Sequence, residues 1–117
     1  MDYRHFIYSE FRCKCCGENL MKHETILRLD AAREYAGVPF KINSGYRCFD
    51  HNQEVGGSET SSHRWGHAVD IAAPTAYDRF QIVQGLIKAG FNRIGIGSTF
   101  VHADDDPEKP NFVMWTY

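Results

Sequence analysis

Two histidines and an aspartate are the residues of this chain whose types and spacing are best suited to chemistry. His63 and Asp70 lie in the segment 61–70, which reads Ser-x-His-x-x-Gly-x-Ala-x-Asp, and His102 follows about thirty residues later. Two imidazoles and one carboxylate form a three-ligand set for a divalent metal, above all zinc. A structural zinc site uses four protein ligands, whereas a catalytic site uses three and keeps a position for water. This set carries one negative charge and the metal ion carries two positive charges, so the ion can still acidify a bound water. The pattern therefore predicts a zinc hydrolase.

Asp104 and Arg47 are the candidate catalytic residues beside the metal. Asp104 follows His102 by two residues, so on a strand the two side chains share a face, and the carboxylate could act as general base toward the attacking water. The alternatives are that Asp104 orients a ligand histidine or only begins an acidic run with Asp105 and Asp106, which we predict to be solvated loop charges. Arg47 could hold a substrate carboxylate or an oxyanion, or could be a structural arginine bonded to loop carbonyls.

The other histidines are predicted not to be ligands. His67 lies four residues after His63, a spacing that binds zinc on a helix, but Gly66 and the β-like sequence that follows argue against a helix. The remaining histidines have no supporting pattern: His5, His23 and His51.

The four cysteines form a tight cluster, at positions 13, 15 and 16, with a distant partner at Cys48. Such a set could be free thiols, a disulfide from Cys48 to the cluster, or a second metal site. The spacing does not match the paired pattern of a zinc ribbon, so we favour free thiols and assign the cysteines no catalytic role.

The elements that must position these residues are predicted to form an α+β fold, with a mostly antiparallel sheet flanked by two main helices. Residues 1–19 indicate an irregular arm. Hydrophobic spacing predicts one helix over 20–36, and a capping box at Thr75 opens another that ends near Gly90. The apolar stripes of the two helices are predicted to be Leu20, Leu27, Ala31 and Tyr35, and Phe80, Val83, Leu86 and Ile87. A short helix is predicted over 50–55, and strands over 40–42, 67–72, 93–97, 99–104 and 112–117.

Alternation along the strands predicts that the candidate residues share one face of the sheet. On the strand over 67–72, Asp70 shares a face with two alanines, whose small side chains leave room for a metal. On the strand over 99–104, His102 and Asp104 share a face. Asp70, His102 and Asp104 can then all lie on the same face of the sheet if the strands are neighbours in one sheet.

The space around the predicted site depends on glycines. Gly95 and Gly97 share one face of the strand over 93–97, and we expect this face to form an open floor for a substrate backbone. His63 lies in the loop before its strand, where Gly66 gives the chain freedom to fold it back over Asp70.

Length and composition are those of an ordinary soluble globule. The 117 residues suffice for one core, so a single domain over residues 1–117 is expected. The formal charge of −2 gives no electrostatic case for nucleic acid, and no apolar run approaches the roughly 20 residues of a membrane span. The N-terminus has no apolar signal-peptide core, so we expect synthesis in the cytoplasm without a signal peptide. A monomer without nucleic-acid or membrane partners is expected.

Nearly the whole chain, from about Phe11 to Tyr117, resembles the zinc D-alanyl-D-alanine carboxypeptidase family. That family includes murein endopeptidases and phage endolysins, and it shares its fold with the hedgehog signalling domain. The N-terminal segment 11–15 is also similar to short, often phage-encoded members. The motifs that carry the resemblance are Ser44-Gly45-Tyr46-Arg47, Asn52, the segment 61–70 and Phe100-Val101-His102-x-Asp104.

The resemblance implies cleavage of the peptide part of peptidoglycan, at the cell wall. His63, Asp70 and His102 match the zinc ligands of the family, and Arg47 matches a position associated with substrate or site support. Well-studied members carry the base carboxylate three residues before the last ligand histidine, where this chain has Thr99. Similar members have His-x-Asp instead, which makes Asp104 the substitute.

Three hypotheses about function follow. The first is a zinc metallopeptidase of peptidoglycan stem peptides, acting as a carboxypeptidase or as an endopeptidase, in phage lysis, in a virion or in bacterial wall remodelling. The second is a hedgehog-like module that binds zinc without hydrolysis, which the missing carboxylate at Thr99 favours. The third is a redox or metal-storage protein built on its cysteines.

Overall fold

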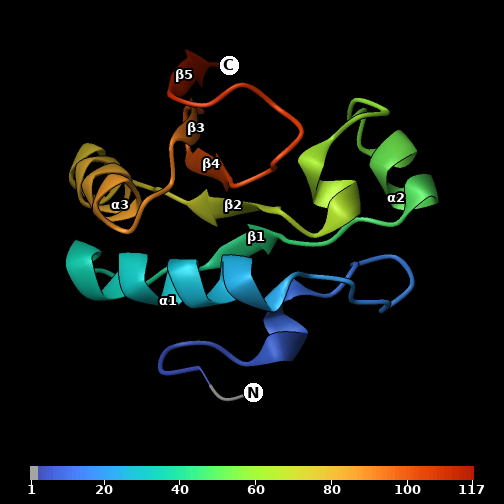
Figure 1. Ribbon diagram of the computed structural model, residues 1–117, viewed down its shortest axis with the longest axis horizontal. Coiled ribbons are helices and arrows are strands. Elements are labelled where there is room, and N and C mark those ends of the chain that lie inside the picture. Colours follow the sequence, from blue (N-terminus) through green and yellow to red (C-terminus); the bar gives the residue numbers. More distant parts are fainter. Residues whose placement is uncertain (1–2) are drawn as a thin grey trace.

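Five strands form one mixed sheet in the computed structural model, which describes residues 3–117 (Figure 1). In chain order they are β1 (Ile42–Ser44), β2 (Ala68–Ala72), β3 (Arg93–Ile96), β4 (Phe100–Asp104) and β5 (Val113–Thr116). Across the sheet the order is β1-β2-β4-β3-β5, and all neighbours are antiparallel except β3 and β5, which run parallel. The predicted α+β fold with a mostly antiparallel sheet is therefore confirmed.

Three α-helices and two short 3₁₀ helices complete the fold. The α-helices are α1 (His23–Ala36), α2 (Phe49–Glu54) and α3 (Ala76–Lys88), and the 3₁₀ helices are η1 (Tyr8–Phe11) and η2 (Ser62–Trp65). The hydroxyl of Thr75 accepts a hydrogen bond from the backbone N–H of Asp78, so the predicted cap does open α3. Helix α1 begins three residues later than predicted because the chain before it is held by a loop: the N–H of Lys22 donates to the carbonyl of Gly66.

The apolar stripe predicted for α1 is wrong. Leu27 and Tyr35 are exposed, as is Leu20 before the helix. The stripe predicted for α3 is wrong in part, because Leu86 is buried but Phe80 and Ile87 are exposed. The buried residues of the two helices are Thr25, Ile26, Leu29, Ala32 and Ala36 in α1, and Ile82, Gly85 and Leu86 in α3.

Small residues explain which faces the helices bury. Helices α1 and α3 pack against each other (Figure 1), and a Cβ built on Gly85 would lie 2.6 Å from the carbonyl oxygen of Ala32 and 2.8 Å from Cβ of Ala36. The two backbones can approach this closely only because the contact is made by glycine and alanine. The position at which α1 and α3 cross therefore determines which face of each helix is buried.

One face of the sheet packs against the core, and the opposite face carries the candidate site residues. The core cluster joins residues of α1 and α3 to alternate residues of the central strands, including Val69, Ile71 and Val101. Asp70 and His102 have the opposite parity and are paired across β2 and β4. The predicted sharing of a face, and the predicted adjacency of the strands, are confirmed.

The acidic segment after β4 is anchored, contrary to the prediction of solvated charges. Asp105 accepts hydrogen bonds from the hydroxyl of Thr25 at 2.7 Å and from the guanidinium of Arg28 at 3.0 Å. Asp106 is buried and accepts a hydrogen bond from the hydroxyl of Ser62 at 2.7 Å. These carboxylates tie the segment to α1 and η2. Within residues 3–117, no helix has the length and apolar character to cross a membrane.

Candidate metal centre

The donor atoms of His63, Asp70 and His102 converge on one point. Oδ1 of Asp70 lies 3.3 Å from Nε2 of His63 and 3.0 Å from Nδ1 of His102, and the three donor atoms all lie within 4.8 Å of one another. Zinc binds nitrogen and oxygen ligands at about 2.0–2.1 Å, so a tetrahedral ion needs donors about 3.3 Å apart. The three side chains fit a single zinc ion.

Strand pairing and a tight turn bring the three side chains together. Asp70 on β2 is the register partner of His102 on β4. His63 comes from η2, which ends at Gly66 in the left-handed conformation with φ of 78°. A Cβ on Gly66 would lie 2.2 Å from the carbonyl oxygen of Leu20, so only glycine allows this turn. The turn brings His63 back over Asp70, as the sequence predicted for Gly66.

Each imidazole is held from behind by a hydrogen-bond acceptor. Nδ1 of His63 donates to the carbonyl of Gly45 at 2.8 Å, and Nε2 of His102 donates to Oδ2 of Asp104 at 2.8 Å. These bonds leave Nε2 of His63 and Nδ1 of His102 as the ring nitrogens that face Asp70. Histidines that bind metals are oriented in this way.

Arg47 holds the second oxygen of Asp70. Its Nη2 lies 3.2 Å from Oδ2 of Asp70, its Nε donates to the hydroxyl of Ser44 at 3.0 Å, and its Nη1 donates to the amide oxygen of Asn52 at 3.4 Å. The partners of Arg47 are thus side chains rather than the loop carbonyls considered above. The contact turns Oδ1 of Asp70 toward the two histidines.

Asp104 is buried, and both its carboxylate oxygens have protein partners. Oδ2 accepts the hydrogen bond from His102, and Oδ1 accepts from Nε of Arg93 at 2.7 Å and from the N–H of Asp106 at 3.2 Å. The ring of His102 stands between Asp104 and the donor atoms that face Asp70. This geometry favours a role in orienting His102, and the role of general base stays a prediction.

Burial and charge set the protonation of the site. Burial lowers the pKa of His63, and the nearby Asp70 offsets this only in part. Burial raises the pKa of Asp70, but its contacts with His102 and His63 outweigh burial and hold that pKa well below its usual range. At neutral pH an ionised carboxylate therefore faces a neutral imidazole of His63, as metal binding requires.

A cavity of about 430 Å³ opens over the three side chains. Its wall includes Arg47 and Lys109, together with the rings of Trp115 and Tyr117. The expectation of an open glycine floor is wrong: a Cβ on Gly95 would lie 2.6 Å from Nε1 of Trp115 and 2.8 Å from the ring of Tyr117. Aromatic rings of the chain itself cover the space that Gly95 leaves.

Sequence reasoning missed two groups that support the site, Arg93 and the carbonyl of Gly45. Arg93 is the register partner of Asp104 across β3 and β4, so pairing the two predicted strands residue by residue would have placed it there. No pattern of residue types indicates a backbone carbonyl. His67 lies outside the cluster, and its Nδ1 lies 3.3 Å from Asp105.

Comparisons with known proteins point to one family. The family model described as Peptidase M15 matches residues 4–104. A segment of 50 residues is 40% identical to a zinc D-Ala-D-Ala carboxypeptidase from Streptomyces albus G. This match covers 42% of the present chain and 20% of the relative.

Proposed function

The chain belongs to the peptidase M15 family, and from this premise we propose that it is a zinc-dependent peptidase that hydrolyses peptide bonds of peptidoglycan. The observation that carries the proposal is the convergence of His63, Asp70 and His102 in a cavity of about 430 Å³. The set has three protein donors, as catalytic zinc sites do, whereas structural sites have four.

The donor set would hold zinc through Nε2 of His63, Oδ1 of Asp70 and Nδ1 of His102. When bound there, zinc supplies a Lewis acid that polarises a carbonyl and lowers the pKa of water to about 7. The residues of the chain orient this set. The carbonyl of Gly45 fixes His63, and Asp104 fixes His102.

Arg47 has two roles in the proposal. Its contact with Oδ2 of Asp70 keeps the carboxylate turned toward the histidines, and its place on the cavity wall puts positive charge beside the donor set. An arginine in such a position can stabilise a developing oxyanion or bind a peptide carboxylate. Arg93 and Lys109 add two further positive charges to the wall.

Asp104 is proposed to be a positioning residue. Its two oxygens are taken by His102 and by Arg93, so the carboxylate lines the cavity with both oxygens already bonded within the protein. A carboxylate on the far side of a ligand histidine fixes the tautomer and raises the basicity of the ring. The alternative is the general base, in which Asp104 would have to leave one of these partners.

Peptidoglycan stem peptides are the proposed substrate, and the cell wall is the proposed place of action. The support is the name of the relative, a D-Ala-D-Ala carboxypeptidase, whose match includes 50 residues of this chain. A carboxypeptidase must bind a terminal carboxylate, and for this Arg47 would have to release a partner such as Asp70, or Lys109 would have to release Ser62. An endopeptidase needs a groove that is open at both ends of the bond.

Digestion of purified peptidoglycan tests the proposal. We expect soluble muropeptides or free D-alanine to appear, to stop with a chelator and to return with zinc. Mass spectrometry of the products distinguishes the carboxypeptidase, which shortens stem peptides by one terminal residue, from the endopeptidase, which cuts within stems or cross-links. The His63→Ala, His102→Ala double variant is the control, and equal turnover by this variant would refute the proposal.

A zinc-binding module without hydrolysis is the second candidate. It is favoured by Thr99, which stands where well-studied relatives have a carboxylate, and by the engagement of both oxygens of Asp104. The same digestion decides between the two: a zinc-loaded protein that binds peptidoglycan but releases no product would be such a module.

A further inference from the structure

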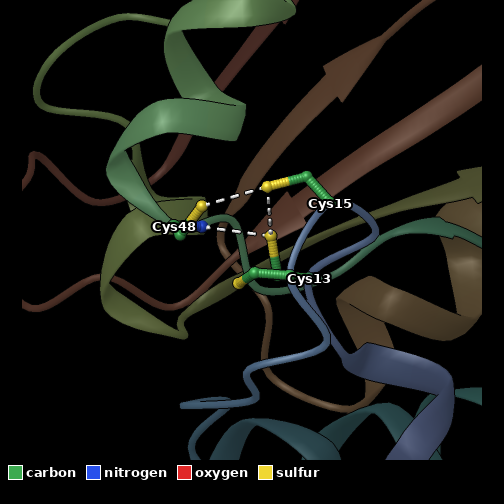
Figure 2. Close-up of side chains that lie close together, drawn as sticks. Cys13, Cys15 and Cys48 are labelled. Atoms are coloured by element: carbon green, nitrogen blue, oxygen red, sulfur yellow. Dashed lines mark hydrogen bonds between the residues drawn. The ribbon is translucent and has the colours of Figure 1, made fainter.

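Four cysteine sulfurs from two distant segments meet at a second place in the fold. Figure 2 shows three of these cysteines, Cys13, Cys15 and Cys48. Sγ of Cys15 lies 3.4 Å from Sγ of Cys48 and 4.0 Å from Sγ of Cys13. With Cys16 included, the four sulfurs all lie within 4.8 Å of one another. Residues 35 positions apart in the sequence thus supply one compact group of soft ligands.

We propose that these four sulfurs hold one zinc ion in a closed structural site, separate from the candidate catalytic centre. Zinc binds thiolates at about 2.3 Å, so four sulfurs around a tetrahedral ion lie about 3.8 Å apart. The two distances above, 3.4 and 4.0 Å, lie on either side of this value. Four protein ligands leave no position for water, which is the arrangement of structural rather than catalytic zinc.

The distances exclude a disulfide in this structure and favour a single ion over a cluster. A disulfide needs sulfurs about 2.05 Å apart, and all four cysteines are free. An iron–sulfur cluster places several irons and inorganic sulfides between its cysteines, so it needs a wider cage than one in which every sulfur is within 4.8 Å of the others. Thiolates select zinc among the abundant divalent metals through their softness.

Backbone N–H groups prepare the sulfurs for a cation. The N–H of Cys48 donates to Sγ of Cys13 at 3.4 Å, and the N–H of His51 donates to Sγ of Cys48 at 3.4 Å. Several thiolates this close repel one another, so the full set can ionise only around a cation.

The site would lock the N-terminal arm against the segment that supports the catalytic candidates. Next to the cluster, the N–H of Tyr46 donates to the carbonyl of Phe11 at 2.8 Å, and a Cβ on Gly45 would lie 2.7 Å from that same oxygen. Gly45 supplies the carbonyl that orients His63, and Arg47 directly precedes Cys48 in the sequence. A zinc ion that joins the arm to Cys48 would therefore hold both the carbonyl of Gly45 and the side chain of Arg47 in place.

Metal counting on single variants tests the inference. Protein purified under reducing conditions is expected to carry two zinc ions per chain by native mass spectrometry. Cys15→Ser and Cys16→Ser, both at exposed positions, are expected to carry one, and so is the His63→Ala, His102→Ala double variant. Lys14→Ala, an exposed substitution between two of the ligands, is the matched control and should keep two.

Cobalt spectroscopy gives a second measurement that needs no cysteine variant. In the His63→Ala, His102→Ala double variant, one cobalt ion should show intense thiolate-to-metal charge-transfer absorption. Absence of this absorption, a mass deficit of two hydrogens from a disulfide in the reduced preparation, or iron in place of zinc would overturn the inference. The outcome is independent of peptidase activity, since a protein without turnover can still carry the cysteine-bound ion.

Discussion

Nε2 of His102 donates to Oδ2 of Asp104 at 2.8 Å, while Nδ1 of the same ring lies 3.0 Å from Oδ1 of Asp70. One imidazole therefore connects a buried carboxylate, held by Arg93, to the carboxylate of the candidate metal set. The same ring cannot turn without breaking one of these contacts. Its orientation toward the proposed zinc thus depends on Asp104.

The first prediction separates the two roles of Asp104. If Asp104 orients His102, Asp104→Asn should weaken zinc binding by about 10–100-fold, and excess zinc should restore much of the turnover. If Asp104 is the general base, the variant should keep its zinc affinity and lose turnover at every zinc concentration. Chelator competition measures the affinity, and peptidoglycan digestion at saturating zinc measures the turnover. Asp50→Asn, at an exposed position, is the control.

The second prediction concerns the ligand set itself. His63→Ala, Asp70→Ala and His102→Ala should each remove one zinc ion per chain and abolish turnover, because each deletes one of only three protein donors. Elemental analysis and peptidoglycan digestion provide the two measurements. His23→Ala, which changes an exposed histidine outside the set, should alter neither. Full zinc content in Asp70→Ala would show that the aspartate is not a ligand.

The candidate site could be located from the sequence because its geometry is mostly local. Strand alternation has a period of two, so the spacing within each strand already fixes the shared face of His102 and Asp104 and the parity of Asp70. Only the pairing of β2 with β4 was needed to bring them together, and two short antiparallel strands with opposed polar residues have few alternatives. Gly66 was also informative, since glycine marks a turn that other residues cannot make.

The rest of the fold depends on contacts that no local pattern encodes. The stripe of α1 was mispredicted because its buried face combines Ile26 and Leu29 with small residues, and two of these, Ala32 and Ala36, allow the close approach to Gly85. Asp105 and Asp106 looked like loop charges, yet both accept hydrogen bonds from distant segments. The same holds for the cysteines, whose meeting depends on where the N-terminal arm docks.

The third prediction tests the close crossing of α1 and α3. Gly85→Ala should lower the free energy of unfolding by about 1–3 kcal/mol, because the new Cβ would meet the carbonyl oxygen of Ala32 at 2.6 Å and the helices must move apart. Helix propensity alone would favour alanine, so the sign of the effect is diagnostic. Urea denaturation measures the change. Lys88→Ala, on the exposed end of α3, should stay within about 0.5 kcal/mol of the parent, and a stabilised Gly85→Ala would contradict the packing.

The fourth prediction is the pH dependence of zinc binding at the candidate catalytic centre. Burial lowers the pKa of His102, but Asp104 and Asp70 outweigh burial and raise that pKa above its usual value of about 6.5. A proton and zinc compete for Nδ1 of His102, so zinc affinity should be full above the raised pKa and should fall as the pH drops through it. Burial keeps the pKa of His63 below its usual value, so this ring stays unprotonated over the same range.

Replacement of the carboxylate tests this assignment directly. In Asp104→Asn one of the two charges that raise the pKa of His102 is gone and Asp70 remains, so the fall in zinc affinity should begin at a lower pH than in the parent, although the affinity at high pH is weaker. Chelator competition over a series of pH values gives both curves, and NMR titration of His102 in the metal-free proteins gives the pKa itself. Curves that fall at the same pH in both proteins would show that Asp104 does not control the protonation of His102.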